Sequence, residues 1–272
     1  MTPAIISRRT ITVFGAALAV LVLVFGLVTF RVGGDSGVVA ASDIGETVVV
    51  ALAALVLFDS ARRLGAGTSL GRPWLLVAFG AASFAVGDAI WTFIEVGMGQ
   101  EVPYPGLPDV FYLLEYPLVA MGVLSAGLAF RGLIPLKRPA ALAVILGVVA
   151  TAGIYVGLLA PAVLTAPDVS GGERLLSALY PLADTWLMVV PAVFVLGVVS
   201  MLGGGRLAWP WLAVGVGAVL IAASDIGYSW LATYDAYESG AFVDYGWGLG
   251  HAFMMLGALI ARDLADPHTS SE

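Results

Sequence analysis

The chain has 272 residues, of which 60% are hydrophobic and only 11% are charged, with a formal net charge of −7. A soluble domain carries about 25% charged residues, so this composition excludes an ordinary soluble core and predicts an integral membrane protein. The net charge says little about a nucleic-acid partner, but the sequence has no basic patch interleaved with aromatic residues, so we expect none. The absence of cysteine excludes disulfides and thiolate metal sites.

Eight apolar runs are long enough to cross about 30 Å of hydrocarbon, which predicts an all-α membrane protein with eight transmembrane helices. The first run follows Arg8 and Arg9 and looks like an export signal. Its apolar core of about 20 residues is longer than the 7–15 of a usual signal, so we expect it to be retained. The runs cover residues 10–30, 44–60, 73–96, 109–130, 139–163, 175–201, 208–232 and 242–261.

The positive charges predict the orientation of these helices. Only Arg31 and Arg174, among twelve Lys and Arg residues, fall outside the N-terminus, the even-numbered loops and the C-terminus. Cytoplasmic loops retain positive charge, so both termini are predicted to be cytoplasmic. An Ala-, Val- and Gly-rich composition with Arg preferred to Lys is typical of a high-GC bacterium, and we expect a multi-pass protein in the lipid bilayer of its inner membrane.

The two halves of the chain contain similar segments. PWLLVAFGA at 73–81 and PWLAVGVGA at 210–218 match at six of nine positions, and the tryptophan of each precedes an aspartate, Asp88 or Asp225, by fourteen residues. Such self-similarity predicts an internal duplication. Because each copy has an even number of crossings, the copies should share one orientation and be related by an axis along the membrane normal. The expected organisation is one membrane domain of two parallel four-helix repeats, residues 1–138 and 139–272.

Acidic and aromatic residues recur three, four or seven positions apart within the predicted helices, a spacing that places them on one helix face. Carboxylates are costly against lipid, so these faces should line an outward-facing vestibule inside the bundle. Tyr228 and His251 are expected to serve Asp225 as a hydrogen-bond donor and a positive partner. The predicted ligand-binding residues are Asp88, Trp91, Glu95, Asp109, Tyr112, Glu115, Tyr116, Asp184, Asp225, Tyr228, Asp244, Trp247 and His251.

Structural roles compete with ligand binding for several of these positions. Asp109, Glu46 and Asp244 could equally cap helices at the interface. Asp88 and Asp225 could hold the bundle together through a mutual hydrogen bond. The tryptophans on the cytoplasmic side are expected to form an interfacial belt; they are Trp74, Trp209 and Trp211.

The same residues give little support to an enzyme or a metal protein. His251 could ligate a metal with Asp244 or Asp225, but the sequence has no second intramembrane histidine to join it. No set of nucleophile, base and orienting group supports hydrolysis, so we predict no enzymatic activity and identify no cofactor.

The segment between the third and fourth runs is rich in proline. Pro103, Pro105 and Pro108 favour extended or turn conformations and cannot continue the preceding helix. Pro108 is expected to begin the fourth helix, with Asp109 in its first turn favoured by the helix dipole. We therefore expect this segment to form a rigid lid over the predicted vestibule.

The third and fourth runs carry a set of motifs: Gly87-Asp88, Trp91, Glu95, Pro103-Tyr104-Pro105, Asp109, Tyr112-Leu113 and Tyr116-Pro117-Leu118. With these motifs the segment resembles the multi-helix membrane region in front of many bacterial diguanylate cyclase, phosphodiesterase and histidine-kinase modules. The resemblance implies a sensory input region for an unassigned ligand. No output module follows the last run in this sequence, so a separate signalling protein is the expected partner. The alternative is a small transporter for a cation or amine, with Asp88 and Asp225 as coupling carboxylates.

Overall fold

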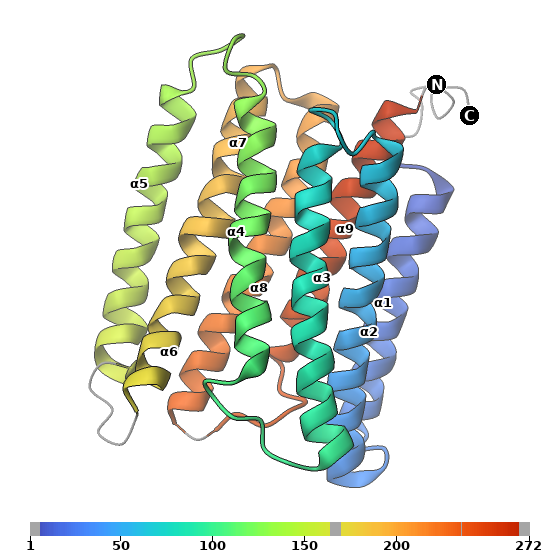
Figure 1. Ribbon diagram of the computed structural model, residues 1–272, viewed down its shortest axis with the longest axis vertical. Helices are drawn as coiled ribbons and strands as arrows, with labels where there is room; N and C mark the ends of the chain where they lie inside the picture. The colour runs from blue at the N-terminus through green and yellow to red at the C-terminus, as the bar shows by residue number, and fades with distance from the viewer. Residues whose placement is uncertain (1–5, 164–169, 235, 267–272) are drawn as a thin grey trace.

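The computed structural model describes residues 6–163, 170–234 and 236–266, and within these ranges the chain is helical, with no strand. The helices pack side by side as an elongated bundle, in which α1 starts and α9 finishes at the same end (Figure 1). The first half contains α1 (Arg8–Thr29), α2 (Gly34–Arg63), α3 (Arg72–Thr92) and α4 (Leu107–Leu128). The second half contains α5 (Lys137–Ile154), α6 (Gly171–Ala183), α7 (Val190–Met201), α8 (Trp209–Thr233) and α9 (Asp244–Ala265).

Three π-helical segments extend or join these helices. The first, η1 (Phe93–Gly97), continues α3, the second, η2 (Tyr155–Val163), continues α5, and the third, η3 (Asp184–Val189), joins α6 to α7. Among the described residues, seven helices are long and apolar enough to cross a membrane, counting α6, η3 and α7 as one. The prediction of an all-α chain of membrane-spanning character is therefore confirmed. The eighth predicted run corresponds to α9, which is less apolar and packs against α1, α2 and α8.

The second helix is longer than the sequence indicated. The predicted run began at residue 44, whereas α2 begins at Gly34, directly after a tight turn in which Gly33 and Gly34 have φ values of 84° and 70°. Glycine adopts this left-handed backbone without steric cost, so the chain can reverse and start a helix at once. The predicted boundary was wrong because polar residues interrupt the apolar pattern in the first turns, which include Asp35 and Asp43.

Trp74 lies in the core of the bundle and not in an interfacial belt. Its side chain is 1% exposed, and its ring stacks on that of Trp211 at a centroid distance of 4.9 Å and an interplanar angle of 14°. The prediction of a belt is wrong for Trp74, because the stack between α3 and α8 removes it from lipid. Trp209, which is 48% exposed, is accessible as a belt residue would be.

Two helix pairs approach closely at glycines. A Cβ atom added to Gly122 of α4 would lie 2.7 Å from the carbonyl oxygen of Pro73 in α3. A Cβ atom on Gly257 of α9 would lie 2.6 Å from the carbonyl oxygen of Pro210 in α8. Both contacts are shorter than van der Waals distance and involve backbone atoms, so each helix pair depends on the missing side chain.

We therefore expect Gly122→Ala and Gly257→Ala each to lower the free energy of unfolding by about 1–3 kcal/mol, as overpacking does in a tight core. Gly26→Ala in α1 is the matched control, because an added Cβ there meets nothing within 4 Å. Since alanine is also the better helix former, the control should be neutral or stabilising. Unfolding in mixed detergent would measure all three, and equal tolerance at the three positions would contradict the packing.

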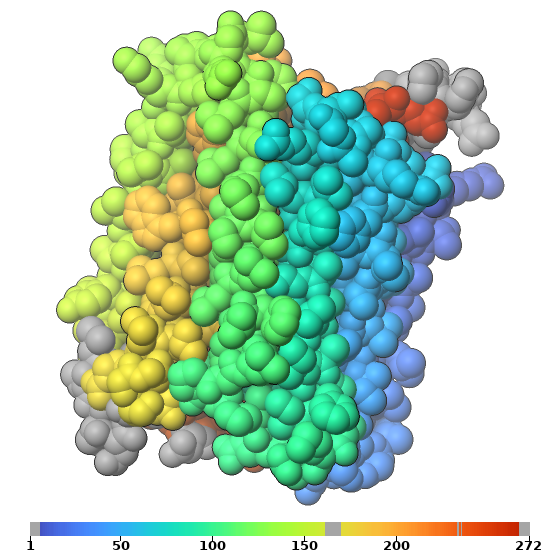
Figure 2. Space-filling model, in the orientation of Figure 1, coloured from blue at the N-terminus to red at the C-terminus, as the bar shows by residue number. Residues whose placement is uncertain are grey.

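The end of the bundle that carries the termini is rich in arginine. Asp59 of α2 accepts ion pairs from four of them, with N···O distances between 2.7 and 3.6 Å, and so ties together α1, α2 and α9. The partners are Arg9, Arg62, Arg63 and Arg262. On one face of the molecule α3 and α4 lie side by side, followed by α6, α7 and α5 (Figure 2).

Candidate ligand-binding site

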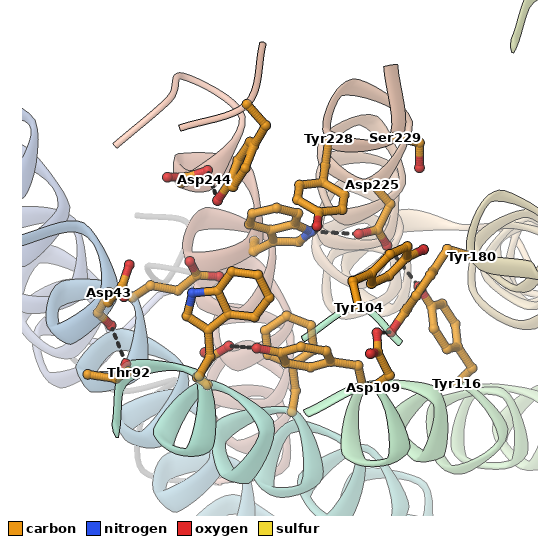
Figure 3. A pocket seen from close by; sticks show the side chains of 17 residues that line it. Asp43, Thr92, Tyr104, Asp109, Tyr116, Tyr180, Asp225, Tyr228, Ser229 and Asp244 are labelled. Carbon is orange, nitrogen blue, oxygen red and sulfur yellow. Dashed lines mark hydrogen bonds between the residues drawn. The ribbon is translucent and has the colours of Figure 1, made fainter. Parts of the chain in front are cut away.

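A cavity that opens to solvent lies toward the end of the bundle opposite the termini. Seventeen side chains converge on it from helices of both halves and from the two loops that precede α4 and α9 (Figure 3). Six of them are carboxylates and eight are tyrosine or tryptophan. The lining consists of Asp43, Glu46, Phe84, Asp88, Trp91, Thr92, Tyr104, Asp109, Tyr112, Tyr116, Tyr180, Asp225, Tyr228, Ser229, Tyr237, Asp244 and Trp247.

Nine of the thirteen predicted site residues line this cavity. The helical spacing correctly grouped them into faces, because residues three or four apart project from one side of a helix. The remaining four, namely Glu95, Glu115, Asp184 and His251, are not in its wall.

Asp88 of α3 and Asp225 of α8 both line the cavity but have different partners. Asp88 Oδ1 accepts a hydrogen bond of 3.0 Å from the Tyr112 hydroxyl, and its buried Oδ2 has no partner among the described residues. Asp225 accepts two hydrogen bonds, from Trp247 Nε1 at 2.9 Å and from the Tyr116 hydroxyl at 2.8 Å. One aspartate is therefore fully satisfied by the protein, whereas the other retains a free acceptor.

Asp109 and Asp244 both line the cavity, but only Asp109 also caps a helix, because Gly106 is the N-cap residue of α4 whereas Gly240 lies in the loop before α9. Asp109 Oδ2 accepts from the Gly106 amide at 2.6 Å, and Asp244 Oδ2 accepts from the Gly240 amide at 2.7 Å. Each carboxylate also binds a neighbouring helix, since Tyr180 donates to Asp109 at 2.6 Å and Ser42 donates to Asp244 at 3.0 Å. These bonds fix the rim of the cavity.

Two tyrosines from loops complete the rim of the cavity. Tyr104 projects from the proline-rich segment before α4 and lies within 3.2 Å of the Ser177 hydroxyl, oxygen to oxygen. Tyr237, from the segment before α9, donates to Asp244 at 3.2 Å. Burial raises the pKa of both phenols above the usual value, so both remain protonated hydrogen-bond donors at neutral pH.

His251 pairs with Glu115 and not with Asp225, which corrects the partner expected from the sequence. Both side chains are at most 1% exposed, and His251 Nε2 lies 3.0 Å from Glu115 Oε1. His251 Nδ1 lies 2.8 Å from the Trp247 carbonyl oxygen, which can only accept, so Nδ1 carries a hydrogen. One further proton is then shared between Nε2 and the Glu115 carboxylate.

Glu95 and Asp184 stand behind the wall. Glu95 accepts from Trp91 Nε1 at 2.6 Å and from the Ser239 hydroxyl at 3.0 Å, and thereby holds the Trp91 ring at the cavity. Asp184 is completely buried at the start of η3, beside Asp225. Glu95 therefore supports a residue of the wall, whereas neither carboxylate oxygen of Asp184 has a hydrogen-bond partner among the described residues.

Several residues of the wall are absent from the predicted set. Asp43 was missed because it fell outside the predicted second helix, and the correct start of α2 would have placed it one turn before Glu46. Tyr180 lies on α6, four residues before Asp184, and this spacing places the two side chains on one helix face. The spacing could therefore have predicted Tyr180. Tyr104 and Tyr237 lie in loops, where helical periodicity carries no information.

The arrangement offers acceptors and aromatic faces, and it holds no metal-binding cluster in the described part of the chain, where no three His, Asp or Glu side chains lie close enough together. Comparisons with protein-family models, curated proteins and solved structures find no match to this chain.

Proposed function

We propose that this chain is a bacterial inner-membrane module that binds a small ligand from the outer face and acts as a sensor with a separate signalling protein. The observation that carries the proposal is the cavity itself, which gathers acidic and aromatic side chains from both halves of the bundle. Small ligands usually bind in concave sites of this kind, where a few polar groups converge among aromatic side chains. The resemblance of the third and fourth runs to sensory membrane regions supports the same role.

The proposed orientation places both termini in the cytoplasm and the cavity toward the outside, with eight helices crossing the membrane. The arginines around Asp59 support it, because they lie at the end that carries the termini and positive charge is retained in the cytoplasm. The start of α1 and the end of α9 lie at the same end of the bundle, because the backbone amide of Ser7 donates to Asp263 near the end of α9 at 2.8 Å. A chain that begins and ends on one side of a membrane crosses it an even number of times, which supports α9 as the eighth crossing.

We further propose that residues 1–138 and 139–272 are two parallel copies. The glycine contacts of α3 with α4 and of α8 with α9 are support for this, since Gly122 and Gly257 each meet the carbonyl of the proline that precedes the matched tryptophan. The stack of Trp74 on Trp211 is further support, because equivalent residues touch each other only near a rotation axis.

The hydrogen bonds of the wall agree with the same duplication. Tyr112 of α4 donates to Asp88 of α3, and Trp247 of α9 donates to Asp225 of α8. Contacts between the halves are matched as well: the second helix of each copy donates to the first turn of the other copy's fourth helix, through the Ser42 and Tyr180 bonds described above. The ligand site would then lie between the copies.

A transporter for a cation or amine is the second candidate. The Glu115–His251 pair favours it, because this proton-sharing pair is buried behind the wall of the cavity, and acids and histidines inside a membrane often relay protons. The two candidates differ in access: a sensor keeps its site open to one side, whereas a transporter opens it alternately to both.

We expect the single-cysteine variant Ser229→Cys to react with an impermeant cationic thiol reagent in intact cells and not in inside-out vesicles. Ser229 lines the cavity, and the native chain has no cysteine. Ser69→Cys, in the exposed loop between α2 and α3, is the control and should react only in inside-out vesicles. Reaction of Ser229→Cys from both sides would favour the transporter, and reaction only from the inside would overturn the proposed orientation and function.

A further inference from the structure

The wall of the cavity contains three buried carboxylate oxygens without a hydrogen-bond partner among the described residues, one each on Asp43, Glu46 and Asp88. Asp88 is 6% exposed, and its Oδ2 atom has no hydrogen-bond partner in the described part of the chain; the same is true of Oε1 of Glu46. Glu46 lies on α2 and Asp88 on α3, and both line the cavity within electrostatic range of each other. A buried acceptor without a donor destabilises the protein, so a ligand that supplies donors here would be bound favourably.

On the opposite side of the wall, the protein itself supplies the second hydrogen-bond donor to an aspartate. Asp225 receives a second hydrogen bond from the Tyr116 hydroxyl. His251 follows Asp244 by seven residues, as Tyr116 follows Asp109, and so is the residue of α9 that corresponds to Tyr116. Its Nε2 atom pairs with Glu115 and not with Asp88. Asp88 is therefore without the second donor that Asp225 has, and the vacancy lies on one side of the cavity only.

The charge of the wall selects the sign of the ligand. Six of the seventeen lining residues are carboxylates and none is Lys, Arg or His. An anionic ligand would be repelled, whereas a cation would gain electrostatic attraction that is strengthened by the partly enclosed surroundings. The absence of a close three-ligand cluster among the described residues favours an organic cation over a metal ion.

An aromatic cluster stands in the same cavity. The Tyr228 ring lies 4.6 Å from that of Tyr237, 5.9 Å from that of Trp247 and 6.3 Å from that of Tyr104, centroid to centroid. These rings offer a surface for the organic part of a ligand through stacking and edge contacts. They also favour a positive charge close to a ring face.

We propose that the ligand is a small primary amine, whose ammonium group donates to Glu46 and Asp88 and whose organic part lies against the Tyr228 cluster. This inference rests on the proposed ligand-binding function. A primary ammonium carries three N–H donors and can satisfy the vacant oxygens of Glu46 and Asp88, whereas a quaternary ammonium carries the charge without donors. The hydrogen bonds, and not the charge alone, therefore distinguish the ligand class.

Four probes of similar shape test this class against the purified full chain in lipid nanodiscs, with calorimetry as the readout. Phenethylamine should bind most tightly. Its trimethylammonium analogue and 2-phenylethanol should bind at least about tenfold more weakly, since each lacks one of the features that a charged hydrogen bond needs. 3-Phenylpropanoate should not bind. Equal affinity for the analogue, the alcohol or the carboxylate, or failure of phenethylamine to bind, would overturn the amine.

Two substitutions test where the ammonium group binds. Asp88→Asn and Glu46→Gln keep size and polarity and should each weaken phenethylamine about tenfold or more, with little effect on 2-phenylethanol. Glu101→Gln, in an exposed loop outside the cavity, is the matched control and should bind as the unaltered chain does. Unchanged binding in both folded variants would overturn this placement. Reaction of Ser229→Cys in intact cells would show that the outward site stands even where the amine does not bind.

Discussion

Replacement of either member of the Glu115–His251 pair by alanine is expected to lower the free energy of unfolding by about 3–5 kcal/mol. Both side chains are almost completely buried and face each other across α4 and α9 at 3.0 Å. Removing one partner leaves the other as an ionisable group in the bundle interior without its hydrogen bond. The loss is large because water cannot replace the missing partner at this depth.

A double-mutant cycle separates this pairing from simple loss of packing. Glu115→Ala together with His251→Ala should cost clearly less than the sum of the two single changes, since no group is then left unpaired. Glu101→Ala, at an exposed position, should change stability by no more than about 0.5 kcal/mol. Unfolding in mixed detergent measures all four proteins, and additive single effects would show that the two residues do not act as a pair.

Trp74→Ala is expected to destabilise the bundle by about 3–5 kcal/mol, as loss of a large buried aromatic side chain does. The ring is 1% exposed and stacks on Trp211, so its removal opens a cavity between α3 and α8 and ends the stack. Helix association in a membrane depends largely on such packing, because lipid is as apolar as the side chains.

The matched control is Trp209→Ala. It removes the same residue type at the start of α8, two residues before Trp211, where the side chain is 48% exposed. Its expected effect is about 0.5 kcal/mol, the usual size for a surface change. Thermal unfolding in one detergent compares the two variants directly. Equal destabilisation by both would place Trp74 in an interfacial belt and would contradict its position in the core.

Sequence periodicity predicted the faces of individual helices because that property is local. Apolar runs long enough for a bilayer predicted the helices, and the spacing of Asp88 and Trp91, or of Asp244 and Trp247, placed each pair on one face. Nine of the thirteen predicted site residues reached the cavity for this reason. The start of α2 was misplaced because polar residues in its first turns lowered the apolar signal, and Asp43 was lost from the predicted site with it.

By itself, the sequence determined the helical, membrane-spanning character of the chain and the acidic and aromatic faces of its helices, since both follow from composition and from the period of a helix. Only the tertiary structure decided which faces meet. His251 could have reached Asp225 on the evidence of spacing, but helix packing directs it to Glu115 and leaves one oxygen of Asp88 vacant. The partner of a buried polar group depends on the approach of helices far apart in the chain, and no local pattern encodes that distance.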